Sequence, residues 1–483
     1  MNKGTIIKSL IFKTVERFSV KGLGFVISIL LARMLSPEVF GQIALITVVI
    51  NLSQSIIEGG LGTALVQNKD VDDRDYSTVF YICMAMSVVI AAVVFAGAPL
   101  LANYYKSPEM LLPLRVYIFS VFFNSYASIL TARMQREMRF KQIMYCSLTA
   151  TCVSGALAVA LAFSGAGIWT LVVYYFSHTL VNCIAMFAAV RWFPRLTFSV
   201  TRARVLYGFG WKMLASSLLC SLYADLRSLI IGKRFSTEAL GYYDRGNQIP
   251  FVISSAIDSS VQSVMFPVIA KAQEDQSEAA ALLRRSLMLS ALLVLPAMMG
   301  LAAISDTFIR LLLTEKWLPC VPYMQIFCVC YAFYPLHTAN LNAIKAMGRS
   351  DMFLILEVIK KAIGLLALVI TMRMGVLYMA LSRIFTGVLA QIINAWPNSR
   401  LLNYSYPQQL RDMLPAIALS AVMGLLVYTL NFLGLGDFVT LVLQVLAGVG
   451  IYVLGSLLFK LDSFRYILSI LKNLLRRNGA AKE

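Results

Sequence analysis

Charged residues are scarce in this sequence. Asp, Glu, Lys and Arg make up 14% of its 483 residues, whereas 59% of the residues are hydrophobic. So few charges cannot cover the surface of a soluble globule of this size, which excludes a soluble protein and requires lipid as part of the solvent. Apolar stretches recur at short intervals from Ile11 to Phe459. We therefore interpret the chain as a single integral membrane unit.

Residues that carry metal or catalytic chemistry are also few. Neither of the two histidines, His178 and His337, has a metal-binding partner at local spacing, and the eight cysteines lie in or beside apolar stretches, where packing is the expected role. The sequence contains no glycine-rich phosphate loop, serine nucleophile elbow or nucleotide-binding fingerprint. We expect no catalytic residue, no metal site and no cofactor, and hence a protein that is not an enzyme.

The apolar segments predict an all-α polytopic membrane protein with about 14 transmembrane helices. They lie near residues 11–33, 40–66, 76–101, 111–132, 144–164, 167–190, 207–232, 248–270, 286–313, 319–344, 353–373, 376–397, 413–433 and 438–459. Each is about long enough to cross a hydrocarbon core of ~30 Å at a rise of ~1.5 Å per residue. The first segment contains charges and is not followed by a small-residue cleavage site, so we predict a retained helix. The loops between the segments are short, which leaves no room for an extramembrane catalytic domain.

Lysine and arginine are distributed unequally between alternate loops. The sequence has 42 lysines and arginines, of which 11 lie in or at the ends of predicted helices. With the N-terminus in the cytoplasm, 25 of the others lie on the cytoplasmic side. The opposite side holds only Lys106, Lys233, Arg234, Arg245, Lys316 and Arg373. The positive-inside rule then predicts a multi-pass protein of the bacterial inner membrane with both termini in the cytoplasm. Because this topology accounts for most of the formal charge of +18, no nucleic-acid partner is expected.

Residues 460–483 form a basic tail with apolar residues at helical spacing. The apolar residues are Leu461, Phe464, Ile467, Leu468, Leu471, Leu474 and Leu475. This pattern predicts a cytoplasmic amphipathic helix that lies on anionic membrane lipid, and a solvated basic tail is the alternative.

Three cations form a stripe on the first predicted helix. Lys13, Arg17 and Lys21 follow one another at intervals of four residues, which places them on one face. A charged side chain at the bilayer centre costs roughly 2.5 to 3.5 kcal/mol, so the stripe should face water or protein. We predict that it lines a substrate-binding cavity. The alternative is a static network in which Glu16 and neighbouring acids neutralise the stripe.

Other ionisable residues also lie within predicted helices, where a functional role is the default hypothesis. Three lysines are predicted to extend the substrate-binding cavity: Lys212, Lys360 and Lys361. Four carboxylates are candidates for ion coupling: Glu58, Asp225, Asp258 and Glu357. Neighbouring opposite charges also form inert ion pairs, and for each of these residues that alternative stays open.

An internal repeat divides the chain into similar halves. The segment Leu35-Ser36-Pro37-Glu38-Val39-Phe40-Gly41 recurs 200 residues later as Phe235-Ser236-Thr237-Glu238-Ala239-Leu240-Gly241, and the same offset relates Glu58 to Asp258. An offset of six helices preserves orientation, so the halves would be parallel repeats. We predict six-helix bundles at 1–200 and 201–400, helices 13 and 14 at 401–459, and the tail at 460–483. In the first copy, Ser36 is expected to cap the second helix and Pro37 to begin it.

Several motifs together resemble a known family. In the first half they are Leu31-Ala32-Arg33-Met34-Leu35-Ser36-Pro37-Glu38-Val39-Phe40-Gly41, Gly60-Leu61-Gly62-Thr63-Ala64-Leu65-Val66-Gln67 and Asp75-Tyr76-Ser77-Thr78-Val79-Phe80; in the second they are Phe266-Pro267, Glu315-Lys316-Trp317-Leu318-Pro319 and Gly348-Arg349-Ser350-Asp351. Their order and spacing resemble the polysaccharide transporter (Wzx-type flippase) family of the multidrug/oligosaccharidyl-lipid/polysaccharide exporter superfamily, close to its colanic-acid and teichuronic-acid exporter branch. The chain departs from the family at Thr314, where glycine is expected before Glu315.

The resemblance implies two six-helix bundles around a central cavity, with helices 13 and 14 peripheral. It also implies that the protein moves an undecaprenyl-diphosphate-linked oligosaccharide from the cytoplasmic to the periplasmic leaflet, for the synthesis of a surface polysaccharide such as colanic acid, O-antigen or exopolysaccharide. A polysaccharide polymerase would then be a partner. The alternatives are a multidrug or cation exporter of the same superfamily, which should have an anionic cavity, and a membrane glycan polymerase or transferase, which should have a large external loop or a catalytic cluster.

Overall fold

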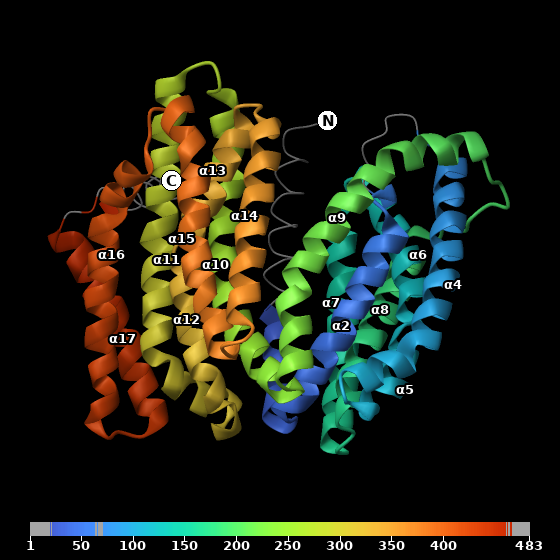
Figure 1. The fold of residues 1–483 in the computed structure, drawn as a ribbon, viewed down its shortest axis with the longest axis horizontal. Coiled ribbons are helices and arrows are strands. Elements are labelled where there is room, and N and C mark those ends of the chain that lie inside the picture. Colours follow the sequence, from blue (N-terminus) through green and yellow to red (C-terminus); the bar gives the residue numbers. More distant parts are fainter. Residues whose placement is uncertain are drawn as a thin grey trace, which may run out of the picture. The chain divides into compact units, whose positions relative to one another are not determined.

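The computed structural model describes residues 20, 22–62, 65, 71–459, 461 and 464–465, without the side chains of residues 201, 205–213 and 350 (Figure 1). In this part of the chain, all regular elements are helices. They belong to two compact units, Met1–Gly241 and Tyr242–Glu483. The predicted helix on anionic lipid falls in the tail, which lies outside the described residues apart from three positions.

The first unit contains the apolar helix Gly22–Met34 and seven labelled α-helices. These are α2 (Pro37–Glu58), α4 (Asp73–Tyr104), α5 (Leu111–Tyr117), α6 (Ser120–Arg136), α7 (Phe140–Phe163), α8 (Ile168–Val190) and α9 (Val200–Arg234), with the 3-10 turn η1 (Pro108–Met110) before α5. Within this unit α7 packs against α8, α8 against α6, and α2 against α9.

The second unit is built from α10, which begins in the first unit, and the helices that follow it. They are α10 (Thr237–Lys271), α11 (Gln276–Leu313), η2 (Glu315–Cys320), α12 (Val321–Ala332), α13 (Tyr334–Ala346), α14 (Ser350–Thr371), α15 (Val376–Leu401), α16 (Tyr406–Thr429), η3 (Leu430–Leu433) and α17 (Asp437–Leu458). Here α16 and α17 pack against α11 and against each other, and they lie at the edge of this unit (Figure 1).

Twelve helices in the described part of the chain are long and apolar enough to cross a membrane. The two other predicted spans are represented by the shorter apolar helix Gly22–Met34 and by α14, which carries Glu357, Lys360 and Lys361. The all-α polytopic class is therefore confirmed, and the count of 14 spans stays a prediction.

Several helices begin earlier than their apolar segments. Starts expected at 207, 248 and 286 are found at Val200, Thr237 and Gln276, because the first turns of these helices are polar and do not register in hydropathy. One assignment was wrong for this reason. Arg245, expected in a loop on the side opposite the cytoplasm, lies inside α10 and is only 3% exposed.

The fourth and the tenth span are irregular in the same way. Each begins with a 3-10 turn, η1 or η2, continues as a short helix, α5 or α12, and is interrupted before a second helix, α6 or α13. The interruptions fall at residues 118–119 and at Phe333. These spans are six apart in the chain, the interval that the predicted repeat gives, and the parallel orientation of the repeats stays a prediction.

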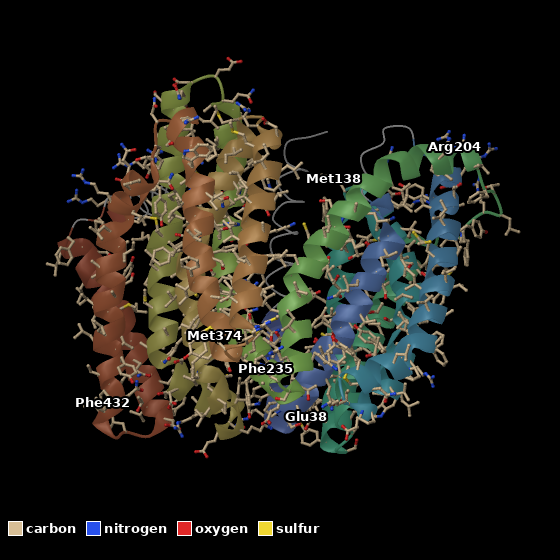
Figure 2. All side chains as sticks on the ribbon, in the orientation of Figure 1. Glu38, Met138, Arg204, Phe235, Met374 and Phe432 are labelled. Atoms are coloured by element: carbon tan, nitrogen blue, oxygen red, sulfur yellow. The ribbon has the colours of Figure 1, made fainter. Side chains whose placement is uncertain are left out.

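The two copies of the heptapeptide both begin a helix, with one difference between them. Pro37 occupies the first turn of α2, as predicted, but the Ser36 side chain makes no capping hydrogen bond, so the predicted side-chain cap is wrong. In the second copy the Ser236 hydroxyl accepts a hydrogen bond from the backbone N–H of Ala239 at 3.0 Å. Glu38 remains in the first turn of α2, where the positive end of the helix dipole favours a carboxylate (Figure 2).

The starts of α2 and α10 meet through two glycines that are 200 residues apart. A Cβ atom on Gly41 would lie against the Thr237 carbonyl group, 2.5 Å from its carbon and 3.1 Å from the Gly241 nitrogen. A Cβ on Gly241 would lie 2.9 Å from the Pro37 carbonyl carbon and 3.3 Å from the Gly41 nitrogen. The contact is thus reciprocal, since each glycine faces the carbonyl group of the residue that begins the other helix, and it allows no side chain at either glycine.

Thr314, the departure from the family pattern, has a backbone conformation that suits glycine. It follows α11 with φ 84° and ψ 164°, a region that a β-branched residue adopts only under strain. We expect Thr314→Gly to raise the free energy of unfolding by about 1 kcal/mol, measured by thermal unfolding in detergent. Thr429→Gly is the matched control: Thr429 has a helical φ of −62°, so that change should lower stability. A loss of stability in both variants would contradict strain at Thr314.

Candidate functional site

The cationic stripe predicted to bind substrate lies in the part of the chain that the structure leaves undescribed. Lys13, Arg17 and Lys21 fall outside the described residues, and Lys212 lies on α9 without a described side chain. The described part of the candidate site therefore consists of the remaining ionisable residues.

Glu58 ends α2 and is half-buried inside the first unit. Gln54, one turn earlier, donates a hydrogen bond to its Oε1 at 2.7 Å, and the Ser128 hydroxyl of α6 is a second hydrogen-bond partner. No lysine or arginine of the described residues lies within 4 Å of this carboxylate. Among the described residues, the negative charge is thus met by neutral hydrogen-bond donors.

Asp258 lies on α10 in the second unit and is 3% exposed. Gln262, one turn later, lies 3.3 Å from its Oδ1, and the Thr338 hydroxyl of α13 is a further partner. Gln262 is itself held by Ser286 of α11 at 3.4 Å and by Asn342 of α13 at 3.2 Å. As for Glu58, the described residues place no cation within 4 Å of the carboxylate.

The surroundings of these two acids contain the same kinds of polar group, although these groups are not at repeat-related positions: the glutamine precedes Glu58 by one turn and follows Asp258 by one turn. Each carboxylate has a glutamine one turn away on its own helix, and each has a hydroxyl from the broken span of its own unit, Ser128 from the fourth and Thr338 from the tenth. In the described part of the chain, neither carboxylate has a cation within 4 Å, so each is free to hold a small cation with the help of these polar partners. The sequence offset predicts that the two acids are related, and the structure gives each of them a glutamine and a hydroxyl as neutral partners.

Glu357 and Lys360, predicted for ion coupling and substrate binding, lie next to each other on α14. The Lys360 ammonium lies 2.5 Å from Glu357 Oε1, and the lysine side chain is 8% exposed. This is the local ion pair that the sequence left open as an alternative. Lys361 follows on the same helix. Among the described residues, no group of three or more His, Cys, Asp or Glu side chains could hold a metal ion.

The seventh span, α9, carries a half-buried acid and a buried cation. Asp225 is half-buried, and Arg227 is 6% exposed with an Nε atom that has no hydrogen-bond partner in the described structure. The sequence placed Arg227 within the membrane but did not include it among the candidate site residues. The sequence did indicate a role for Arg227, since an arginine in an apolar helix is energetically costly unless it faces water, protein or substrate.

Two further arginines lie among aromatic rings in the second unit. The Arg245 guanidinium lies 5.4 Å from the centre of the Trp317 ring and donates to Gln248 Oε1 at 3.1 Å. Arg383 of α15 lies 5.6 Å from the centre of the Phe327 ring. Sequence reasoning missed Arg245 because its helix began earlier than hydropathy indicated.

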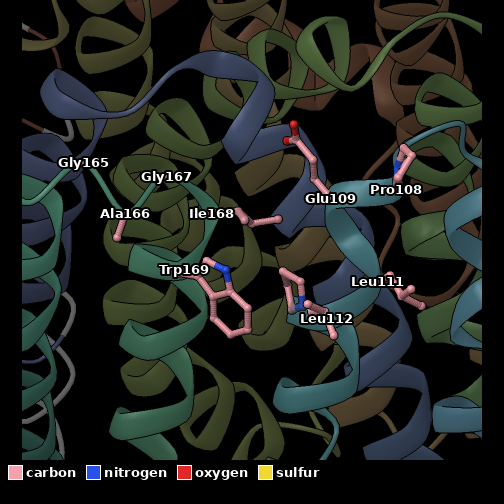
Figure 3. Close-up of a pocket in the computed structure, with 10 residues that line it drawn as sticks. Pro108, Glu109, Leu111, Leu112, Gly165, Ala166, Gly167, Ile168 and Trp169 are labelled. Atoms are coloured by element: carbon pink, nitrogen blue, oxygen red, sulfur yellow. The ribbon is translucent and has the colours of Figure 1, made fainter.

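The two described cavities do not provide an anion-binding site. A pocket of about 480 Å³ in the first unit is lined by residues between Pro108 and Pro113 and between Gly165 and Trp169 (Figure 3). Its only charged lining residue is Glu109, which would repel an anion. A second cavity of about 380 Å³ lies mainly among α11, α16 and α17 and is lined by apolar residues and by Gln444 and Tyr452.

Together, the apolar helices and the ionisable side chains held within them define a multi-pass membrane protein of the transporter class. Residues 30–322, more than half of the chain, match the family described as polysaccharide biosynthesis protein. The chain belongs to this family, which confirms the resemblance found in the sequence.

Curated relatives agree with this assignment. The succinoglycan biosynthesis transport protein ExoT of Rhizobium meliloti (strain 1021) is 24% identical over 349 residues, 72% of this chain and 71% of ExoT. The teichuronic acid biosynthesis protein TuaB of Bacillus subtilis (strain 168) is 26% identical over 62% of each chain, less than two thirds of TuaB. The lipopolysaccharide biosynthesis protein WzxC of Escherichia coli (strain K12) is 22% identical over 84% of each chain.

A solved structure shares the fold. The lipid II flippase MurJ in its inward closed conformation superposes with a TM-score of 0.75 at 15% identity, covering 94% of this chain and 99% of that chain. At this level of identity the similarity concerns the arrangement of the helices and not the ligand.

Proposed function

We propose that this protein is a flippase of the bacterial inner membrane. It would move an undecaprenyl-diphosphate-linked oligosaccharide from the cytoplasmic to the periplasmic leaflet during surface polysaccharide synthesis. The family match over residues 30–322 carries this proposal, and the transport role named for ExoT supports it. Both termini are placed in the cytoplasm, because the lysine and arginine count favours that side. We assign no catalytic chemistry to the chain.

The substrate's diphosphate needs cationic partners once it leaves water. We assign this role first to Arg17, whose planar guanidinium can bind phosphate oxygens in a bidentate manner, and to Lys13 and Lys21 as point charges on the same face. Buried Arg227 is a further candidate on α9. Lys212 and Lys361 remain candidates, whereas Lys360 already has Glu357 as its partner.

Energy coupling is assigned to the repeat-related acids Glu58 and Asp258, which would each take up and release a proton or a small cation. Their neutral hydrogen-bond partners support this assignment over Glu357, whose charge is balanced by Lys360. Asp225 remains a candidate. The membrane potential would assist as well, since outward movement of an anion from a negative cytoplasm is favourable by roughly 2.3 kcal/mol per charge per 100 mV.

Two partners follow from the proposed reaction. A polysaccharide polymerase on the periplasmic side would use the translocated repeat unit, and anionic membrane lipid would bind the basic tail at 460–483.

Complementation in a strain that lacks the gene and any other flippase tests the proposal. The wild-type protein should restore the surface polymer, and repeat units should stay on the cytoplasmic leaflet without it. Arg17→Glu should restore nothing at normal membrane abundance, because a carboxylate repels the diphosphate in a partly desolvated site. Arg17→Lys should retain part of the export, because the charge survives while the bidentate geometry is lost.

Two outcomes would contradict these assignments separately. Repeat units that reach the periplasm without the protein would show that it is not the flippase. Wild-type export by the Arg17→Gln, Glu16→Gln double variant would assign the stripe to a static ion-pair network and remove it from the substrate path.

A further inference from the structure

The linker between α8 and α9 is fastened to the start of α4 by backbone hydrogen bonds. The N–H of Arg195 donates to Ser77 Oγ at 2.9 Å, and the N–H of Ser199 donates to Thr78 Oγ1 at 3.3 Å. Both hydroxyls also donate to carbonyl groups one turn earlier in α4, at 2.8 and 2.7 Å. Each hydroxyl therefore bridges its own helix to a segment more than 100 residues away in the chain.

An ion pair between a half-exposed arginine and a buried carboxylate holds the first turn of α9. Arg202 Nη1 lies 2.8 Å from Asp75 Oδ2, and the Asp75 side chain is 2% exposed. The same carboxylate oxygen accepts the N–H of Asp72, which caps α4. The backbone N–H of Asp75 and the nearby Arg202 charge hold the pKa of Asp72 below its usual value. A buried carboxylate that loses its cationic partner is destabilised, so Arg202 stabilises Asp75 at this position.

Aromatic packing holds the other end of the linker. Trp192 is 6% exposed, and its ring centre lies 6.1 Å from that of Tyr76 and 6.5 Å from that of Phe80. Tyr126 of α6 stacks on Trp192 at 6.2 Å, and its hydroxyl donates to the Trp192 carbonyl oxygen at 2.5 Å. The linker is thus held at its beginning by rings, in its middle by hydroxyls and at its end by an ion pair.

All of these contacts return to one sequence motif. In the segment Asp75-Tyr76-Ser77-Thr78-Val79-Phe80, every residue except the buried Val79 makes a specific contact with residues 192–202. We propose that this motif is a linker anchor, and that Asp75 is a positioning residue which holds the first turn of α9 against α4 throughout transport. The role in transport rests on the proposed function; the anchor itself does not.

The consequence concerns α9, which bears Asp225 and Arg227 of the candidate site. Because its start is fixed to α4, this helix has one end that stays with the first unit. The whole of α9 is part of that compact unit. Any movement of α9 during transport is then a bend or rotation that leaves its first turns in place. A latch that opens during the cycle is the competing arrangement, and the two differ in what a cross-link would do.

A disulfide between α4 and the linker separates these arrangements. In a cysteine-free background that retains export, Thr78→Cys with Ser199→Cys should cross-link on oxidation, since the Ser199 N–H lies 3.3 Å from the Thr78 hydroxyl. Export should stay unchanged in the cross-linked protein. Loss of export that a reducing agent restores would overturn the permanent anchor, and failure to cross-link would overturn the contact. Cross-linking does not require that the chain be a flippase, so it tests the anchor apart from the proposed function.

Neutral substitutions test the role of Asp75. Arg202→Gln should lower the maximal export rate about ten-fold, because it leaves a buried carboxylate beside Asp72 without its partner. The substrate concentration for half-maximal rate should not change. Adding Asp75→Asn to Arg202→Gln should recover most of the rate, since no unbalanced charge remains. Exposed Arg204 near the start of α9 supplies the matched control, and Arg204→Gln should export normally (Figure 2). Equal loss in the two arginine variants, or no recovery in the double variant, would overturn the positioning role.

Discussion

Replacing Gly41 by alanine is expected to abolish export and to reduce the amount of folded protein in the membrane. The added methyl group would lie 2.5 Å from the carbonyl carbon of Thr237, which is backbone and cannot turn aside as a flexible side chain could. Overpacking of this kind typically costs about 1–3 kcal/mol of stability. Because the atoms that the methyl group would meet are backbone atoms of Thr237 and Gly241, we expect a cost toward the upper end of this range. The measurement is the yield of monodisperse protein in detergent together with polymer export in cells.

Gly97 of α4 is the control for this substitution. A Cβ atom there would have no other atom within 4 Å, so Gly97→Ala should leave export intact and raise helix stability by up to ~1 kcal/mol. Gly241→Ala should resemble Gly41→Ala, because the contact is reciprocal. If Gly41→Ala behaved like Gly97→Ala, the close approach of α2 and α10 would be contradicted.

Asp258→Asn is expected to remove the dependence of transport on an imposed ion gradient. Asparagine keeps the size of the side chain and its hydrogen bonds to Gln262 and Thr338, but it cannot exchange a proton or hold a cation as a carboxylate does. In proteoliposomes loaded with a labelled lipid-linked oligosaccharide, a gradient should accelerate flipping by the wild-type protein and not by this variant. Slow flipping down the substrate's own gradient should persist.

Asp306→Asn is the matched control variant for this experiment. Asp306 is about half exposed and paired with Arg310 at 2.8 Å, so its neutralisation should leave the gradient response intact. Glu58→Gln reports on the second acid, and loss of the response there would show that both acids take part. A normal gradient response in the Asp258→Asn, Glu58→Gln double variant would remove these acids from energy coupling.

Hydropathy alone predicted the helical architecture, because lipid-exposed helices must present long apolar surfaces. It failed where helices continue into polar residues, as at the starts of α9, α10 and α11, and this error moved Arg245 from a buried helix into a loop. The relation of Glu58 to Asp258 by the repeat offset stays a prediction. The hydroxyls beside them could not be predicted, since Ser128 and Thr338 reach the acids from other spans through tertiary packing.

Ion pairs could also be predicted from the sequence only where the two residues are close together in the chain. Glu357 and Lys360 are three residues apart on one helix, a spacing that brings side chains together, so their ion pair was foreseeable as one of two alternatives. The partner of Asp75 is 127 residues away, and nothing in the sequence near either residue indicates Arg202. The family motif thus marked an important segment without indicating what it contacts.

The reciprocal glycine contact also has the form of an isologous interface. Pro37 of the first copy faces Gly241 of the second, and Thr237 of the second copy faces Gly41 of the first, as residues do across the two-fold axis of a dimer. If α2 and the start of α10 were on two separate chains, they would make this contact only at a sufficient density in the membrane, because association follows mass action. Because both helix starts belong to one compact unit of one polypeptide, they meet at a fixed effective concentration, so dilution of the protein in the bilayer does not separate them.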